Sequence, residues 1–550
     1  MRFPRIGSDR SQRSARSVYG PWLLALALFL VYGTDSLARY YRMAPGSYDL
    51  GIFVEAVKQY AHFHAPVVDI MGQNFNLLGD HFHPILAVLG PVFLLFPSPL
   101  TLLIAQAALF AVAAVPLVWL GRSRLGEGAA YAVAVAYGLS FGIAQAVDVD
   151  FHEIAFAVPL LAFALWAMLE DRDAVLISCC FLALLCKEDI GLTFVLPIGI
   201  GVMLRGRLVL GAAVSAMGTA GSLIAIYWLI PMFNPQHIYT YWSKNGCLGT
   251  HGAAVTGAAT TATGSGDPIT CLLSSAQSNA GTKLELVFLL LAVTAFCALR
   301  SPLGFLAVPN LGLRFISTDS SFWGTGYHYN AVLMPVLCVA AIDAMDRARR
   351  AKAAVPLEIE ATEPEPEPVL VAAGPSAGPL EAAEAVEAAE QGDPLTPTSE
   401  RTHDEPSAPG TIRRWGAGIS GAMGRHGAVA MLAASLAMVP QFAFNQFFDP
   451  NTFTFDARTD ALRQAESMVP SGVTVEATIN VLAPLAARDD AYWVGNSNPA
   501  PQYVVLDAVV SGFPGTISDP VQWVDGRHSG SSYEIIWSNP YGIYVLKQMS

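Results

Sequence analysis

Five short clusters of ionisable side chains interrupt or border apolar runs of the sequence. The most crowded is QAVDVDFHEIAF (145–156), which places three acids and one histidine within six positions. The others are YDLGIF (48–53), GDHFHP (79–84), CKEDIGL (186–192) and GTGYHYN (324–330). Ionisable groups at membrane depth are costly, and they usually line a cavity or a functional site. The clusters therefore predict a polar site assembled from several segments.

The residue types in these clusters suit proton chemistry. Crowded, partly buried carboxylates can be tuned to act as a base, and acids, histidines and lysine together can form a proton relay. His81 and His83 are two apart, so they face the same way only on an extended segment. Together with Asp80 they are a candidate site for a divalent metal.

The same residues also have interpretations without chemistry. Asp148 could be a solvated helix end. Asp150 and Glu153 are three apart and would share a helix face, where one of them could pair with Lys187 and join two helices. The GLSFG sequence around Ser140 matches a hydrolase pattern that requires a strand-to-helix turn. It lies within an apolar helix instead, so we expect no catalysis by Ser140.

The composition indicates a membrane protein with several spans. The chain has 550 residues, of which 53% are hydrophobic and 14% are charged, whereas soluble domains carry about 25% charged residues. Apolar runs of about 18 residues or more recur along most of the chain. The net charge of −13 arises almost wholly from residues 356–405, which contain thirteen acids and one arginine. The remainder is nearly neutral, so we expect no nucleic-acid partner.

The positive-inside rule orients the predicted spans. The first seventeen residues carry five arginines and one acid, so the N-terminus should be cytoplasmic. About eleven crossings follow, with a short interfacial helix at 84–96. The predicted parts are a basic cytoplasmic N-terminus (1–20), an all-α transmembrane domain (21–346), a disordered acidic cytoplasmic linker rich in Pro, Ala and Glu (347–425), a last transmembrane helix (426–448) and an extracytoplasmic α/β domain (449–550).

The C-terminal part has the sequence pattern of a small α/β domain. VTVEATI, QYVVLDAVV, SYEIIW and YGIYVLK predict strands, and ARTDALRQAESMV predicts a helix. Acids and histidines are not concentrated there, so we expect the chemistry elsewhere. The topology also places Cys247 and Cys271 in one long outer loop, where two thiols in an oxidising compartment are expected to form a disulfide.

The predicted topology brings all five polar clusters to the outer face of the membrane. The inner ends of the spans carry only arginine-rich stops such as GRSRLG and RGR. This asymmetry is the main functional signal in the sequence. The candidate site residues are Asp49, Asp80, His81, His83, Asp150, His152, Glu153, Lys187, Glu188, Tyr327 and His328.

The order YDLGIF, GDHFHPIL, DFHEIAFAVP, KEDIGL and YHYN resembles an uncharacterised family of polytopic bacterial membrane proteins. That family is grouped with the GT-C class of glycosyltransferases. The segment from HPILAVLG to GRSRLG is also similar to the second-helix region of that class. The resemblance covers about residues 20–346.

The resemblance implies a glycosyltransferase of the bacterial plasma membrane. It implies a polyprenyl-phosphate sugar donor, transfer on the outer face of the bilayer, and an unknown glycan or protein acceptor. An acid in the first outer loop is the hallmark of the class, and Asp49 matches it; Asp150, with Glu153 nearby, matches a second acid. Lys187, Glu188, His81, His83, His152, Tyr327 and His328 are then expected to bind substrate. The histidines depart from the class pattern, which leaves dependence on a divalent metal open.

Two other classes of function fit the same residues. A transporter or lipid flippase could use intramembrane acids, histidines and lysine as a proton relay. Such proteins usually place polar sites near the bilayer midplane and often contain internal repeats, and the sequence shows no repeat. A non-enzymatic membrane assembly protein, whose outer domain binds a partner, is the third alternative.

Overall fold

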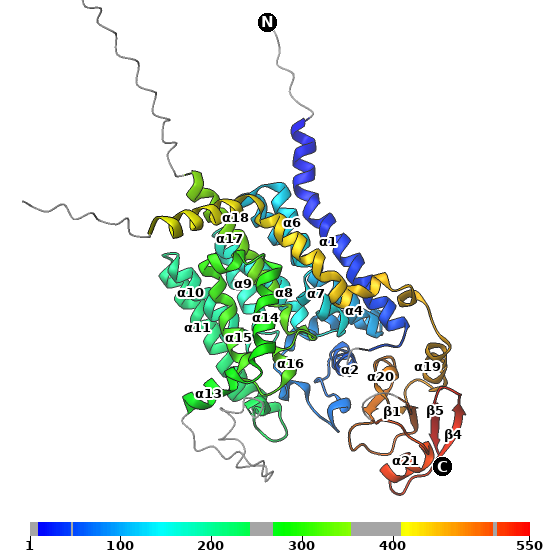
Figure 1. Ribbon diagram of the computed structural model, residues 1–550. Helices are drawn as coiled ribbons and strands as arrows, with labels where there is room; N and C mark the ends of the chain where they lie inside the picture. Colours follow the sequence, from blue (N-terminus) through cyan, green and yellow to red (C-terminus); the bar gives the residue numbers. More distant parts are fainter. Residues whose placement is uncertain (1–8, 46–47, 243–267, 354–408, 510–513, 550) are drawn as a thin grey trace, which may run out of the picture.

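The structure is a computed structural model of the chain, and it describes residues 9–45, 48–242, 268–353, 409–509 and 514–549. A large bundle of mostly apolar helices is followed by a small α/β domain that lies against one end of the bundle (Figure 1). The first described helix, α1 (Asp9–Tyr41), begins at the opposite end. The predicted division into a helical domain and a small α/β domain is therefore confirmed.

The helical domain contains helices of very different length. Its α-helices are α1 (Asp9–Tyr41), α2 (Asp49–Ala61), α3 (Gly90–Leu95), α4 (Pro99–Val112), α5 (Ala114–Leu125), α6 (Glu127–Gly138), α7 (Phe141–Asp148), α8 (Ile154–Leu169), α9 (Asp173–Ala183), α10 (Leu196–Leu204), α11 (Leu208–Ile224), α12 (Ile230–Phe233), α13 (Pro268–Gln277), α14 (Ala280–Val293), α15 (Val308–Phe315), α16 (Ser320–Trp323), α17 (Leu333–Ala353) and α18 (Pro409–Met438).

Short 3₁₀- and π-helical segments connect or extend these α-helices. The 3₁₀ turns are η1 (Asp69–Met71), η2 (Leu77–Gly79), η3 (Pro84–Leu89), η6 (Thr240–Trp242), η8 (Cys297–Arg300), η9 (Pro302–Ala307), η10 (His328–Asn330), η11 (Val439–Gln441), η12 (Ala443–Phe448) and η13 (Pro450–Phe453). The π-helical turns are η4 (Gly191–Val195) and η5 (Ala225–Leu229).

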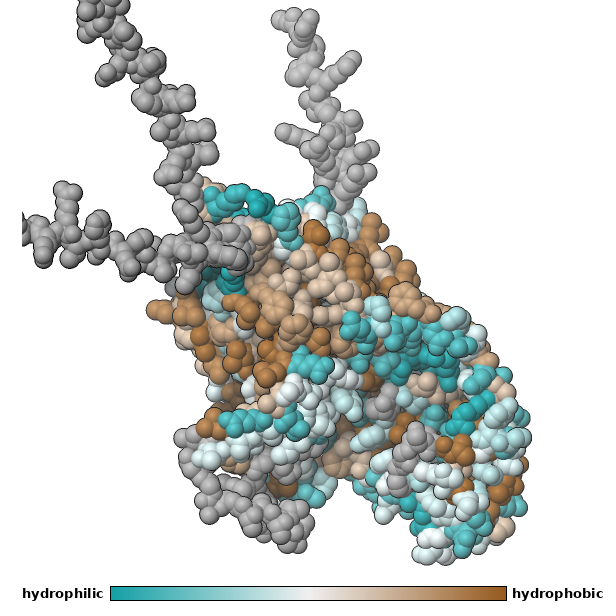
Figure 2. All heavy atoms as spheres, viewed as in Figure 1, coloured by the Kyte–Doolittle hydropathy of each residue, from teal (hydrophilic) through white to brown (hydrophobic). Residues whose placement is uncertain are grey.

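Five helical segments in the described part of the chain are long and apolar enough to cross a membrane: Val18–Tyr41, Pro99–Leu125, Glu127–Asp148, Leu208–Phe233 and Ala422–Gln441. Shorter apolar helices are Pro84–Leu95, Ile154–Leu169, Asp173–Ala183 and Gly191–Leu204. Figure 2 shows, on the face it presents, an apolar band between two polar ends. The protein therefore has several membrane helices, while the expected eleven crossings and their orientation stay predictions.

Small residues allow close contact where α10 packs against α11. A Cβ atom added to Gly211 would lie 2.5 Å from the carbonyl oxygen of Gly199, and one added to Gly199 would lie 2.3 Å from Oγ of Ser215. Neither position has room for a side chain. In lipid, helices associate through such close backbone contact because no hydrophobic effect drives them together.

The C-terminal domain is a five-stranded mixed sheet with helices on both faces. Its elements are α19 (Ala457–Met468), β1 (Thr474–Ala477), α20 (Ile479–Ala486), β2 (Asp490–Trp493), β3 (Tyr503–Asp507), α21 (Pro520–Arg527), β4 (Tyr533–Ser538) and β5 (Ile543–Gln548). The strand order is β2-β1-β3-β5-β4. β1 is parallel to β2 and β3, and β5 is antiparallel to β3 and β4.

Only one face of the sheet contributes side chains to the hydrophobic core that is shared with the helical domain. Val505 and Val545 belong to the hydrophobic core that continues into the helical domain, whereas Val504 and Leu546 belong to a separate cluster with Val524 of α21. Successive side chains of a strand point to opposite faces, which accounts for this division.

Several predicted boundaries need correction. α17 continues to Ala353 and α18 begins at Pro409, so both helices extend into the range 347–425 that was predicted as linker. The last long helix ends at Met438 and short 3₁₀ turns follow, instead of one span over 426–448. α1 begins within the predicted N-terminal tail of residues 1–20.

Other predictions lie partly or wholly outside the described residues. The centre of the linker, residues 354–408, is one of them. Cys271 lies on α13, but Cys247 is not among the described residues, so the disulfide between them stays a prediction.

Candidate active site

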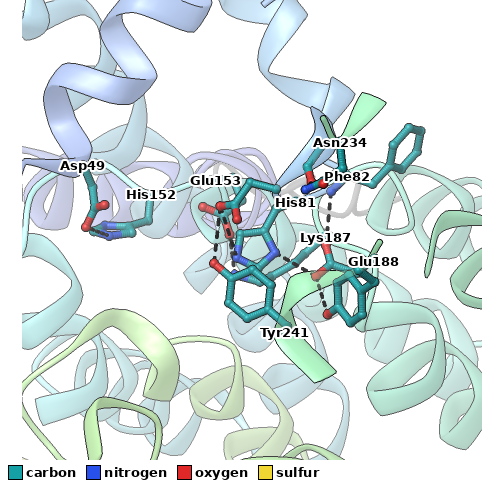
Figure 3. A network of polar contacts seen from close by, with 12 residues as sticks. Asp49, His81, Phe82, His152, Glu153, Lys187, Glu188, Asn234 and Tyr241 are labelled. Atoms are coloured by element: carbon teal, nitrogen blue, oxygen red, sulfur yellow. Dashed lines mark hydrogen bonds and ion pairs between the residues drawn. The ribbon is translucent and has the colours of Figure 1, made fainter. Parts of the chain in front are cut away.

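The predicted polar clusters meet at the end of the bundle that carries the C-terminal domain. The first turn of α2 carries Asp49, the segment between α7 and α8 carries His152 and Glu153, and the segment after α9 carries Lys187 and Glu188. Figure 3 shows these side chains gathered from separate elements, with Glu153 between the Asp49 and Glu188 groups in this view. The convergence that the topology predicted is therefore present in the fold.

A cavity of about 590 Å³ lies among these side chains. We call it the polar cavity. The predicted residues that line it are Asp49, Asp80, His81, His83, His152, Glu153, Lys187, Tyr327 and His328, and further lining residues include Tyr48, Phe53, Tyr241, Asp319 and Tyr329.

Asp49 is the most accessible acid of the central network, with a side chain that is 35% exposed. Its Oδ2 atom lies 3.3 Å from Nε2 of His152. Burial disfavours the charged imidazole, but the hydrogen bond and charge of Asp49, the charge of Glu153 and the carbonyl oxygen of Asp150 together outweigh burial and raise the pKa of His152. A partly exposed carboxylate at a cavity wall, oriented by a histidine, has the access that a general base requires.

His152 also stacks on His328, with ring centroids 3.7 Å apart. Both ring nitrogens of His328 are buried and have no hydrogen-bond partner among the described residues. Burial, followed by the proximity of His152, lowers the pKa of His328 well below its usual range, and burial lowers the pKa of His83 to about 4. His83 is therefore neutral near pH 7, and a neutral His328 avoids charge repulsion with the His152 ring on which it stacks.

Lys187 and Glu153 form a nearly buried ion pair. Nζ of Lys187 donates to Oε1 of Glu153 over 2.9 Å, and the side chains are 16% and 3% exposed. Burial opposes both charges, but it is outweighed by the partner together with further neighbouring groups, among them His83 for Glu153 and Glu188 for Lys187. The pKa of Glu153 therefore falls well below its usual range and that of Lys187 rises. The pair joins the start of α8 to the segment after α9 and also places a cation on the wall of the polar cavity.

Glu188 is the centre of a second hydrogen-bonded group. Its Oε1 atom accepts from Nδ1 of His81 at 2.7 Å and from the hydroxyl of Tyr239 at 2.9 Å, while Oε2 accepts from the backbone N–H of Phe82 at 3.1 Å. Burial opposes the carboxylate, but the charge and hydrogen bond of His81, together with Lys187, outweigh burial and lower the pKa of Glu188 to about 2. Conversely, burial opposes a charged His81, but Glu188 and Asp80 together outweigh it and raise the pKa of His81.

Asp150 lies apart from the polar cavity, contrary to its expected place beside Glu153. It adopts a left-handed backbone conformation (φ 64°), which Asp tolerates better than most residues. Its carboxylate lies 3.9 Å from Nε of Arg39. Its carbonyl oxygen accepts from Nε2 of Gln106, whose Oε1 accepts from the N–H of His152. Asp150 therefore shapes the turn that presents His152, and its expected catalytic role has no geometric support.

The expected metal site receives no support from the geometry either. No group of three or more His, Cys, Asp or Glu in the described part of the chain is placed to hold a metal ion. His81 Nδ1 is engaged by Glu188, and its Nε2 lies 4.0 Å from Asp80. The hydroxyl of Tyr241 donates to Asp80 over 3.3 Å. Asp80 and His81 are thus held by neighbouring protein groups.

A second, smaller space adjoins the polar cavity. We call this cavity of about 160 Å³ the apolar chamber, because aliphatic and aromatic side chains such as Ile190, Phe194 and Ile226 make up most of its wall. Both spaces are lined by His81, Lys187, Tyr241 and Tyr329. A polar cavity and an apolar chamber therefore share one wall that carries Lys187.

Sequence reasoning missed several residues of this region. Tyr239 and Tyr241 follow α12 in a segment with no ionisable cluster, and Asp319 precedes α16. Arg314 is buried on α15, where it donates to the carbonyl oxygens of Phe322 and Tyr329. Arg314 was the one detectable signal, because an arginine within an apolar run is costly unless it lies inside the protein.

No curated protein matches the chain. A solved structure that resembles it is ArnT from Cupriavidus metallidurans bound to undecaprenyl phosphate, with 13% sequence identity, a TM-score of 0.49, and coverage of 96% of this chain and 98% of that chain. The family described as "Predicted membrane protein (DUF2079)" matches residues 39–359, which is more than half of the sequence. The chain therefore belongs to the DUF2079 family of predicted membrane proteins.

Proposed function

We propose that the protein transfers a sugar from a polyprenyl-phosphate donor to a hydroxyl acceptor at the outer face of the membrane. The observation that carries this proposal is the wall shared by the polar cavity and the apolar chamber. A glycolipid donor has one apolar and one polar part, and the two adjoining spaces match that division. Lys187 lies on the shared wall, where the phosphate between the two parts of such a donor would be.

Asp49 is the proposed general base. It would accept the proton of the acceptor hydroxyl as the oxygen attacks the anomeric carbon of the donor sugar. The bond from that carbon to the phosphate oxygen breaks, and the phosphate leaves with the electron pair. Lys187 and the protonated His81 would stabilise its developing charge. Glu153 would keep Lys187 charged and in place.

Binding of a polyprenyl-phosphate sugar is the first test. Mass spectrometry of lipids that remain on the purified wild-type protein should detect such a donor. The double variant Lys187→Met with Glu153→Gln removes the cation without leaving an unpaired buried carboxylate. We expect it to retain at least about tenfold less of the lipid, equivalent to about 1.4 kcal/mol of binding.

Two outcomes would contradict the proposal. One is a wild-type protein that binds no polyprenyl phosphate when this lipid is added. The other is equal binding by the wild-type protein and the double variant, provided that both have the same unfolding temperature. The transporter alternative receives less support, because transporters place their polar sites near the bilayer midplane and the groups named above lie at one end of the bundle.

A further inference from the structure

The C-terminal domain holds the helix that carries Asp49. Leu482 of α20 packs on Gly51 so closely that a Cβ atom on Gly51 would lie 3.2 Å from Cγ of Leu482. At the other end of α2, Nζ of Lys58 donates to the carbonyl oxygen of Asp489 over 2.6 Å. These contacts fix one side of α2 against a domain that lies outside the matched family region, residues 39–359.

A ring stack completes this contact at the first turn of α2. Tyr48 is the N-cap residue of α2, directly before Asp49, and its ring stacks on Trp493 with centroids 4.9 Å apart and an interplanar angle of 11°. The Trp493 ring lies against the backbone of Gly495, where an added Cβ atom would be 2.2 Å from Cη2 of the indole. The indole of Trp493 fits in this position because Gly495 has no side chain.

The N-cap position of Tyr48 links this ring stack to the first turn of α2. N-cap positions favour Ser, Thr, Asp and Asn, whose side chains accept a hydrogen bond from the first turn. Tyr48 gives no such bond. The backbone carbonyl of Tyr48 accepts from the N–H groups of Gly51 and Ile52, so the position of its ring bears directly on the turn that carries Asp49.

We propose that Trp493 is a positioning residue for Asp49, acting through Tyr48. The stack fixes the first turn of α2 and with it the distance between the Asp49 carboxylate and His152. No residue of the C-terminal domain lines the polar cavity among the described residues, so any effect of this domain on the site passes through neighbouring segments, of which α2 carries Asp49. The importance of Asp49 for catalysis rests on the proposed function, whereas its placement by Trp493 does not.

The test compares substitutions of two tryptophans in the same domain. Trp493→Leu removes the stack, Trp493→Phe keeps an aromatic ring, and Trp523→Leu is the matched control, because Trp523 lies on α21 and its ring faces Arg527. Two probes are used on the full-length protein. Deuterium exchange reports on the amides of Gly51 and Ile52, and carbodiimide with glycine ethyl ester labels accessible carboxylates, which are located by mass spectrometry.

We expect Trp493→Leu to speed exchange at the first turn of α2 at least about tenfold and to raise labelling of Asp49 severalfold. Trp493→Phe should restore most of both values, and Trp523→Leu should change neither. Unchanged exchange and labelling in Trp493→Leu would overturn the proposal. So would equal changes in Trp523→Leu, or a rise spread over all of α2 and the sheet, since either would reflect general destabilisation. Neither probe needs a substrate, so failure here is distinct from failure of the proposed function.

Discussion

The polar cavity and the C-terminal domain both bury charged side chains, but they use them differently. In the C-terminal domain, the buried carboxylate of Glu476 lies 2.8 Å from Nε2 of His528 and 3.3 Å from Arg527. This group joins strand β1 to the segment that begins with α21. At the cavity, Asp49, Glu153 and Lys187 have comparable partners but also border about 590 Å³ of space. Burial and pairing alone therefore do not identify a functional site; access to a cavity does.

The C-terminal domain nevertheless holds a buried ionic group that no local sequence pattern indicated. Glu476 lies 51 positions before Arg527 in the sequence, and it meets Arg527 and the adjacent His528 only in the folded domain. Their arrangement is that of an interior ion pair with a histidine, which is costly to break once it has formed.

Asp49→Asn should have the largest effect on the proposed transfer. It keeps the shape of the side chain and removes the charge, so we expect transfer to fall by about 10²- to 10⁴-fold, the usual contribution of a general base. The unfolding temperature should change little, because Asp49 is partly exposed. Rates measured with donor lipid, alongside a melting curve, check both statements. A stable variant with a normal rate would remove Asp49 from the mechanism.

Glu476→Gln should show the reverse pattern. It leaves the guanidinium of Arg527 and the imidazole of His528 without their carboxylate. Removing one partner of a fully buried pair costs about 3–5 kcal/mol, and because the Arg527 side chain is 25% exposed we expect a smaller loss, about 2–3 kcal/mol. Thermal unfolding measures it. If the rate of transfer fell at temperatures where the variant is still folded, the ionic group of the C-terminal domain would contribute to activity as well as to stability.

His81→Gln should produce a smaller loss of stability that depends on pH. The folded pKa of His81 is raised, so its contribution is complete below about pH 6.5 and is lost as pH rises through the raised pKa. The folded pKa of Glu188 is lowered to about 2, so its contribution is complete above about pH 4.5 and is lost as pH falls toward 2. The difference from wild type should be largest between about pH 4.5 and 6.5, at about 1.5–3 kcal/mol.

Melting curves of wild type and His81→Gln across pH 3 to 9 measure this window. His62→Gln is a suitable control, because His62 is the exposed C-cap residue of α2 and its Nδ1 atom lies 2.9 Å from the carbonyl oxygen of Lys58, with no carboxylate partner recorded among the described residues. A constant difference between wild type and His81→Gln over the whole range would show that the His81–Glu188 contact does not depend on charge.

Tyr327→Phe should have the smallest effect. Tyr327 lines the polar cavity but is 46% exposed. Exposed substitutions usually change free energies by no more than about 0.5 kcal/mol, which is about twofold in rate. A loss of transfer greater than about tenfold would mean that Tyr327 contacts the substrate, and that the active part of the cavity extends to this exposed edge.

The sequence by itself determined the membrane helices, the α/β character of the last hundred residues, the family and the gathering of polar clusters at one end. Each follows from local properties. Long apolar runs predict membrane helices, and alternation of apolar and polar residues predicts strands. Because consecutive membrane helices run in opposite directions, every second connecting loop lies on the same side of the membrane. Short elements without a strong pattern, such as β2 and α20 with its internal Pro484, were missed for the same reason.

Only the tertiary structure decided which ionisable groups face open space. Asp150 and Glu153 look equivalent in DVDFHE, yet a left-handed backbone at Asp150 turns one carboxylate toward Arg39 and leaves the other with Lys187 on the cavity wall. The role of Tyr239 could not be predicted, because a tyrosine in a sequence gives no sign of the hydrogen bond that its hydroxyl donates to Glu188 in the fold. The contact between Trp493 and Tyr48 likewise depends on how two domains pack. Such contacts join residues that are distant in the sequence, and no local pattern encodes them.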